Sequence, residues 1–597
     1  MAKKKHTPSG GHSPSLRESF MHLGLRDWNS RRKLPNFLCW PPDVFAFAAW
    51  MLRESGAYTK VALHEDPAIN LTPSWRPRSE WRAEVRRCGR SWGTNVIARP
   101  PQAVVDAFFL LQHAATATSP AATLSDIATS GIWVALHNLL AIADEACWEL
   151  GLVTSSTGAS AAKHEDANKR TDDKGRNAAQ PATLATEALS LLAKHLEDQS
   201  HERAEPFSST LCKFVRRDRA IVLPKIHTPQ AGLTIRSLSH HLALYTGSEV
   251  EALWCPSYPP SVSVRSMSKP QPETFNLLVV PHPFTVAAAQ FRAVEFPDDP
   301  DAKYFSFHHT RGTLTRSVLG KLISSAAEQV GRISGLILPE AAIPDSRSRS
   351  LLGASTGTLP YDLDFLVSGV TTKHSPEKGE WGKNQALVRM NDGENVRENR
   401  QDKHHRWRLT GDQLRMYHIT SPLHPEHNWW ESIQLPLRKL AFFELGRTCV
   451  ITVLICEDLA RPDPAGDLIR AVGPDLVVAL LQDGPQLGNR WPSRFAGVLS
   501  DDPGSSVLTV TSLGMCKRSR PLQNLASPPS RVIAMWRDPI RGHCEIALPL
   551  GHHAAVLTIV KQTSTEFSAD GRNDGDSSTT LTLGSVETLT IPELSGR

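Results

Sequence analysis

Three residues of this sequence follow apolar runs or open a basic loop, and together they could hydrolyse a carbon–nitrogen bond. Cys456 closes the apolar run 450–455, Glu340 closes the apolar stretch 333–339, and Lys403 begins a basic loop. Hydrolysis of an amide or a nitrile needs a nucleophile, a proton carrier and a cation where negative charge develops. Taken singly, each residue also fits a plainer interpretation: a cysteine packed as a small hydrophobe, a carboxylate near a helix start, and a solvated lysine.

The elements expected around Cys456 and Glu340 would present both side chains at one edge of a sheet. The run 450–455 is mostly β-branched and apolar, which predicts a strand buried on both faces. The stretch before Glu340 predicts a second such strand, ending at that carboxylate. Ligands of open α/β sheets bind at the C-terminal edge of the strands. Because Cys449 stands at the start of its strand, Cys456 is the predicted nucleophile.

Several motifs resemble, in their chain order, those of the nitrilase superfamily of carbon–nitrogen hydrolases. Three of them are Leu-Pro-Glu340, Lys403-His-His and Ile-Cys456-Glu-Asp-Leu. Four further segments are similar to the strand, helix, strand and closing pair that follow in that family: 474–481, 490–496, 507–514 and 545–560. The resemblance covers about the C-terminal half of the chain. It implies an α/β fold, the four-layer α-β-β-α sandwich, preceded here by a mostly helical N-terminal domain.

The resemblance also implies roles for individual residues. Glu340 would be the general base, Cys456 would form a thioester, and Lys403 with the backbone N–H of Glu457 would stabilise the oxyanion. Many members position the lysine with an additional glutamate, and both Glu426 and Glu431 are candidates. No metal or organic cofactor is expected, and the substrate would be a small amide, ureide or nitrile.

Composition limits the class of protein. The 597 residues predict two or three domains, and 40% hydrophobic with 21% charged residues is typical of globular proteins. No apolar window is long enough for a transmembrane helix. Nine scattered cysteines predict a reducing compartment, with the cytoplasm as the expected location.

The pattern along the chain predicts six segments. They are a basic disordered tail (1–33), a mostly helical domain (34–152), a low-complexity linker (153–183), a helix with a mixed connecting region (184–271), the nitrilase-like domain (272–562) and a polar C-terminal tail (563–597). Within the helical domain Asp43 is expected to cap a helix, and the adjacent Asp144 and Glu145 are expected to face solvent. Lys213 is expected on a solvated face.

Two other classes of function stay open at this stage. The C-terminal half could be a non-catalytic binding or scaffold module, with a protein partner for the N-terminal region. Alternatively, the basic N-terminal arm could contact nucleic acid, although the net charge is only +5. Nitrilase domains also occur in bacterial phage-defence proteins, so the resemblance allows a defence role, and it allows a homo-oligomer formed through that domain.

Overall fold

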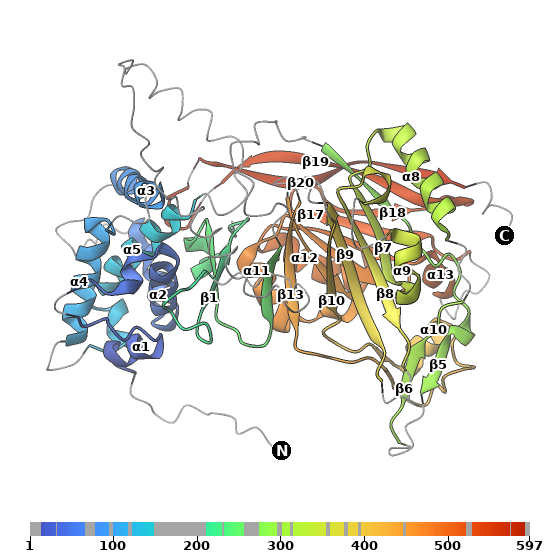
Figure 1. Cartoon of the computed structure of the whole chain (residues 1–597), viewed down its shortest axis with the longest axis horizontal. Coiled ribbons are helices and arrows are strands. Elements are labelled where there is room, and N and C mark those ends of the chain that lie inside the picture. The colour runs from blue at the N-terminus through green and yellow to red at the C-terminus, as the bar shows by residue number, and fades with distance from the viewer. Residues whose placement is uncertain are drawn as a thin grey trace. The chain divides into compact units, whose positions relative to one another are not determined.

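The computed structural model divides the chain into two compact units, which are described separately (Figure 1). Unit 1 contains 1–194, 210–248 and 565–576, and unit 2 contains 195–209, 249–564 and 577–597. The structure describes residues 13–30, 33–65, 78–94, 99–116, 122–148, 211–229, 232–255, 274–294, 301–310, 314–353, 359–374, 380–391, 396–445, 449–520, 528–566, 568–573 and 575–591. The predicted linker 153–183 lies outside these residues.

Unit 1 is mainly helical, as predicted. Its helices are α1 (Leu16–His22), α2 (Pro41–Glu54), α3 (Arg78–Thr94), α4 (Gln102–Thr116) and α5 (Ile132–Ala146), with short 3-10 turns at Asn36–Cys39, Ala57–Glu65, Ser125–Ala128 and Ile235–Leu238. Strands β1 (Ile221–Pro224) and β2 (Leu242–Tyr245) pair antiparallel. Both α2 and α5 are apolar on nearly every side, which suits helices at the centre of a core.

The expected disordered tail is wrong for its second half. Ser15 and Glu18 form a capping box at the start of α1, and Leu16 and Phe20 are buried in the core of unit 1. The expected cap at Asp43 is also wrong, because α2 already begins at Pro41. The buried Asp43 carboxylate instead accepts hydrogen bonds from the backbone N–H groups of residues 213–215. Burial raises the pKa of Asp43 to about 7.

The acidic pair near the end of α5 is fully buried, which corrects the expectation that it faces solvent. Asp144 accepts hydrogen bonds from the backbone N–H groups of residues 240–242 and from the Arg572 guanidinium at 2.8 Å. Arg572 Nε lies 3.9 Å from Glu145 and 3.5 Å from Asp570. All four side chains have no exposed surface, and Arg572 offsets part of the charge of the three carboxylates, together with Arg90, which lies 3.6 Å from Glu145.

Lys213 is exposed, as expected for a residue on a solvated face. Its ammonium group sits 3.5 Å from the centre of the Trp40 ring, a cation–π contact that unites it with the start of α2.

Unit 2 is built around two seven-stranded sheets, counted over the described residues. In spatial order one sheet contains β10 (Val396–Asp402), β9 (Lys383–Asn391), β8 (Phe365–Thr372), β7 (Gly335–Pro344), β4 (Thr274–Val279), β19 (His552–Thr565) and β20 (Ser577–Thr590). The other contains β18 (Gly542–Ala547), β17 (Val532–Asp538), β16 (Ser506–Thr511), β15 (Leu476–Leu481), β14 (Cys449–Ile455), β13 (Lys439–Leu445) and β3 (Glu251–Cys255). A smaller sheet joins β11 (Arg408–Leu409), β12 (Trp429–Glu431), β6 (Tyr304–Phe307) and β5 (Phe291–Val294).

The two large sheets pack face to face, with helices outside them. Strand β7 contacts β15 and β16, and β9 contacts β14, so one apolar core fills the space between the sheets. Helices α8 (Arg316–Val330) and α9 (Asp345–Leu352) pack on the first sheet, and α12 (Trp491–Asp501) packs on the second. The predicted α-β-β-α sandwich is confirmed, and Figure 1 shows its layers. The remaining helices are α10 (Gly411–Met416), α11 (Asp467–Val472) and α13 (Leu513–Arg518), with shorter turns at Ala288–Gln290, Pro360–Asp362 and Pro462–Gly466.

Two expectations for the C-terminal part are wrong. The predicted closing pair divides between the sheets, because β18 belongs to one and β19 to the other. The expected polar tail contains β20, whose buried Leu581, Leu583 and Leu589 join the core between the sheets.

None of the described helices is both long enough and apolar enough to cross a bilayer.

Candidate active site

Glu340 is positioned by an irregularity inside β7. The strand continues to Pro344, so Glu340 does not end it as expected. The pairing with β8 shifts register between Leu338 and Ile343, and Ala341 has a φ of 48°, a left-handed conformation that residues other than glycine seldom adopt. A bulge of this kind re-aims a side chain, and bulges are frequent beside active sites. Gly369 on β8 permits it, since a Cβ there would lie 2.5 Å from the Glu340 Cα.

Lys403 follows β10 and is buried with Glu340. Its Nζ donates to Glu340 Oε1 and to Glu431 Oε2, both at 2.7 Å. The side-chain amide of Asn384 on β9 donates to Glu340 Oε1 and to Glu431 Oε1, also at 2.7 Å. The backbone carbonyl of Asn384 accepts from the Lys403 backbone N–H. One lysine and one amide therefore fix both carboxylates.

The two glutamates left open by the sequence occupy different places. Glu431 ends β12, is 8% exposed, and holds Lys403 Nζ and the backbone N–H of Trp407. The Glu426 side chain is 80% exposed and lies beside His424, so Glu426 is not part of the cluster.

Cys456 stands at the C-terminal end of the buried strand β14, where the chain turns into the 3-10 helix Cys456–Ala460. Its φ of 51° is again left-handed, a strained conformation that tends to occur at functional sites. Strand β15 runs parallel to β14, so its C-terminal end lies at the same edge of the sheet. The N–H of Glu457 is in the first turn of the short helix, where backbone donors have no intrahelical acceptor.

Asp458 connects the loop of Lys403 to the turn of Cys456. Its buried carboxylate accepts from the backbone N–H groups of His404 and His405 at 3.0–3.1 Å. His405 Nδ1 also lies 3.0 Å from Asp458 Oδ1. Asp458 thereby fixes the loop after Lys403 against the turn of Cys456, although the two are more than fifty residues apart in the sequence.

The charges of the cluster act on one another through a dry environment. Burial raises the pKa of Glu340, against the opposing effect of the Lys403 cation. Burial would lower the pKa of Lys403, but Glu340 and Glu431 outweigh it and raise that pKa well above its usual value. Burial, and after it the Glu340 charge, raises the pKa of the Cys456 thiol well above its usual value. At rest Cys456 is therefore a neutral thiol and Lys403 an ammonium group, and burial favours uptake of a proton by Glu340.

Each carboxylate oxygen of Glu340 has a different environment. Oε1 accepts from Lys403 and Asn384, whereas Oε2 is buried with no hydrogen-bond partner among the described residues. A buried acceptor without a partner is costly, and such atoms call for an explanation. Oε2 is free to receive a proton.

Sequence reasoning missed Asn384 and the bridging role of Asp458. Asn384 lies inside a strand and carries no motif of its own. Asp458 was visible as the second carboxylate after Cys456, but its partners are backbone groups, which a sequence does not mark. Within the part of the chain that the structure describes, no three His, Cys, Asp or Glu side chains are grouped to hold a metal ion.

Comparison with known proteins gives matches among solved structures alone. The solved structures that this chain resembles include a nitrilase-superfamily protein, a CN-hydrolase superfamily protein, a NitFhit protein and a carbon-nitrogen hydrolase. Nit3 of Saccharomyces cerevisiae is 12% identical, with 55% of this chain and 95% of that chain covered and a TM-score of 0.27. A CN-hydrolase superfamily protein of Xanthomonas campestris is 13% identical, with coverage of 48% and 89% and a TM-score of 0.27. The NitFhit protein of C. elegans is 12% identical, with coverage of 48% and 60% and a TM-score of 0.30.

No family model and no curated protein matches the chain. The function of the chain is therefore inferred from its residues and their geometry.

Iodoacetamide at neutral pH is expected to modify Cys456 before Cys449 or Cys516. Burial raises the pKa of all three thiols and a cation opposes it at each, but Cys456 stands at the C-terminal edge of the sheet beside Glu340, whose unpartnered Oε2 can take the thiol proton. The exposed Cys39 and Cys544 will react as well, so both are first replaced by serine. Peptide mass spectrometry over time reads the order, and earlier modification of Cys449 or Cys516 would contradict the assignment.

Proposed function

We propose that unit 2 hydrolyses a non-peptide carbon–nitrogen bond with Glu340, Lys403 and Cys456 as its catalytic residues. The observation that carries the proposal is the buried cluster in which Lys403 bonds Glu340 and Glu431 beside a thiol at a sheet edge. Burying three charged groups is costly, and a scaffold protein gains nothing from leaving Glu340 Oε2 unpartnered. The substrate class is a small amide, ureide or nitrile.

For an amide, the reaction proceeds in two halves. In the first, Glu340 takes the Cys456 proton while Sγ attacks the carbonyl carbon, and the tetrahedral adduct forms. As the C–N bond breaks, Glu340 gives the proton to the departing nitrogen and a thioester remains. In the second, Glu340 takes a proton from water and the hydroxyl oxygen attacks the thioester carbon; as the C–S bond breaks, Glu340 returns the proton to the Cys456 sulfur. The products are an acid, ammonia or an amine, and the restored thiol.

Lys403 and the Glu457 backbone supply the positive end of the site. An ammonium group has three donors, and Glu340 and Glu431 occupy two of those on Lys403. The third is left for the oxyanion that forms during each half-reaction. The N–H of Glu457 is the second donor, and loss of one such donor typically costs about 10²–10³ in rate. Glu431 and Asn384 position the lysine and the base.

A screen of amides, ureides and nitriles for release of ammonia or amine tests the proposal. Glu340→Gln should lower the rate on any substrate found by roughly 10²–10⁴-fold, because the amide keeps the shape but cannot accept the proton. Glu426→Gln is the matched control: it removes the same charge from an exposed glutamate and should leave the rate unchanged. The proposal fails if no compound of the three classes is hydrolysed, or if Glu340→Gln keeps the wild-type rate.

A further inference from the structure

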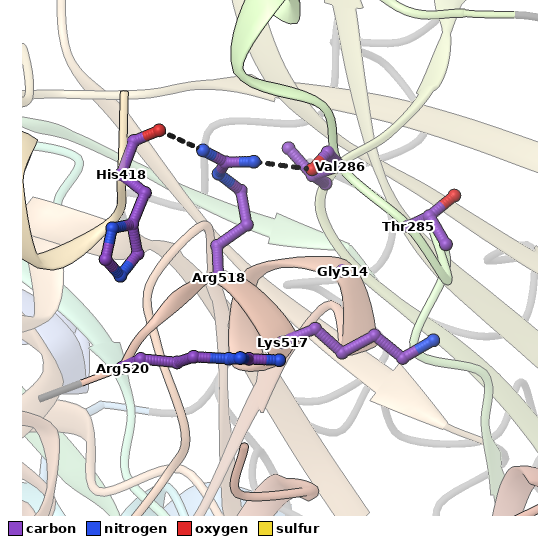
Figure 2. Close-up of a pocket in the computed structure, with 7 residues that line it drawn as sticks. All are labelled: Thr285, Val286, His418, Gly514, Lys517, Arg518 and Arg520. Carbon is purple, nitrogen blue, oxygen red and sulfur yellow. Dashed lines mark hydrogen bonds between the residues drawn. The ribbon is translucent and has the colours of Figure 1, made fainter. Parts of the chain in front are cut away.

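A pocket of about 480 Å³ opens in unit 2, and its lining is basic (Figure 2). Helix α13 contributes Gly514, Lys517 and Arg518, and Arg520 follows it. His418, Thr285 and Val286 complete the wall. None of the described residues that line the pocket is acidic.

Arg518 fixes the walls but leaves its charge unbalanced. Its guanidinium donates to the carbonyl oxygens of Tyr417 at 2.8 Å and Val286 at 3.2 Å, and also to that of His418. Figure 2 shows this side chain reaching both the His418 and the Val286 carbonyls. These acceptors are neutral, and no carboxylate of the described residues pairs with this half-buried guanidinium.

Lys517 and Arg520 are the free cations of the pocket. Both are half-buried, and neither side chain forms a hydrogen bond or an ion pair with any residue that the structure describes. Burial, and after it the nearby Arg531, lowers the pKa of Lys517, as expected for a cation held among like charges. Three cations around a cavity without a carboxylate attract an anion of more than one charge.

The pocket lies at the same sheet edge as Cys456. Strands β14, β15 and β16 run parallel, and α13 follows directly after the C-terminal end of β16. The loop that supplies Thr285 and Val286 also contains His282, whose Nδ1 lies 2.8 Å from the Ala342 carbonyl oxygen, two residues from Glu340. Ligands of parallel sheets collect at this edge.

We propose that this pocket binds a small ligand through a dianionic group, a phosphate or a dicarboxylate, held by Lys517 and Arg520. Arg518 keeps the walls in place and adds its charge. Binding needs no turnover, so the proposal stands or falls independently of the hydrolytic function.

Isothermal titration calorimetry of the full chain tests it, with inorganic phosphate and malonate as separate probes in buffers of matched sodium chloride. At least one probe should bind at one site, and the one that binds identifies the source of the anion. Lys517→Gln and Arg520→Gln should each weaken binding roughly tenfold or more, because each removes a charge-assisted contact. Arg494→Gln on α12 removes the same charge from an exposed position outside the pocket and should change nothing.

Three results would overturn the proposal. They are no binding of either probe, wild-type affinity in the Lys517→Gln/Arg520→Gln double variant, and an equal loss of affinity in Arg494→Gln. The last result would mean that the anion binds through the overall positive charge of the protein and not at this pocket.

Discussion

A Cys456→Ala variant is expected to fold like the wild type and to lose at least about 10⁴-fold in turnover. Without the thiol no thioester can form, and the remaining groups can only bind substrate. Alanine fills most of the same space in the buried turn, so the free energy of unfolding should fall by no more than about 1–2 kcal/mol. Cys456→Ser should be nearly as inactive, since a hydroxyl is far less acidic than a thiol and Glu340 is a weak base for it.

The matched control for this experiment is Cys449→Ala. Cys449 is the other cysteine of β14, equally buried, and stands at the opposite end of the strand. Both variants are assayed for ammonia or amine release, and circular dichroism checks their folding. Hydrolysis by Cys456→Ala at the wild-type rate would remove the basis of the enzymatic proposal. Loss of activity in Cys449→Ala alone would identify Cys449, at the other end of the strand, as the nucleophile.

An Arg572→Met variant is expected to destabilise unit 1 by about 3–5 kcal/mol. The change removes the guanidinium that bonds Asp144 and faces Glu145 and Asp570, and leaves those carboxylates buried with fewer cations. Asp144 is the most affected, because it loses the hydrogen bond from Arg572 at 2.8 Å, whereas Glu145 keeps Arg86 at 3.9 Å and Arg90 at 3.6 Å. Methionine keeps much of the side-chain volume of arginine, so the loss of stability measures the removal of the charge and not the opening of a cavity.

Hydrogen exchange read by mass spectrometry measures this effect unit by unit, which a single melting curve of a two-unit protein cannot do. Amides of α5 should exchange faster in Arg572→Met, while those of β14 and β15 should keep their wild-type rates. Arg216→Met is the control: its side chain is 51% exposed and pairs with Asp218, so it should cost less than about 1 kcal/mol. Unchanged exchange in α5 would show that the buried carboxylates do not depend on Arg572.

The parts of unit 2 that the sequence predicted are those set by local pattern. The strand before Cys456 is mostly β-branched and apolar, so it could be recognised without knowledge of its neighbours. The order of Glu340, Lys403 and Cys456 along the chain indicated the cluster that the structure brings together. The bulge in β7 could not be foreseen, because it depends on the close packing of Gly369 from the next strand.

Polar composition gave wrong expectations where polar segments belong to buried elements. Asp144 and Glu145 were expected to face solvent because most adjacent carboxylates on helices do, and the guanidinium that bonds Asp144 comes 428 positions after it. In β20, Leu581 and Leu583 alternate with threonines, the pattern of a strand, but the high content of serine and threonine suggested a tail. Glu426 and Glu431 could be separated only by coordinates, since both follow Lys403 at similar distances.

The late position of Arg572 has a consequence for how the protein is made. Ribosomes add roughly 5–20 residues per second, so an interval of 428 residues corresponds to roughly 20–90 s between the emergence of Asp144 and that of its partner. Throughout that time the first unit lacks residues 565–576, which belong to it. The N-terminal unit therefore cannot finish folding first, as leading domains usually do. Its core is complete only when nearly the whole chain has been translated, because Asp144 lacks its arginine until then.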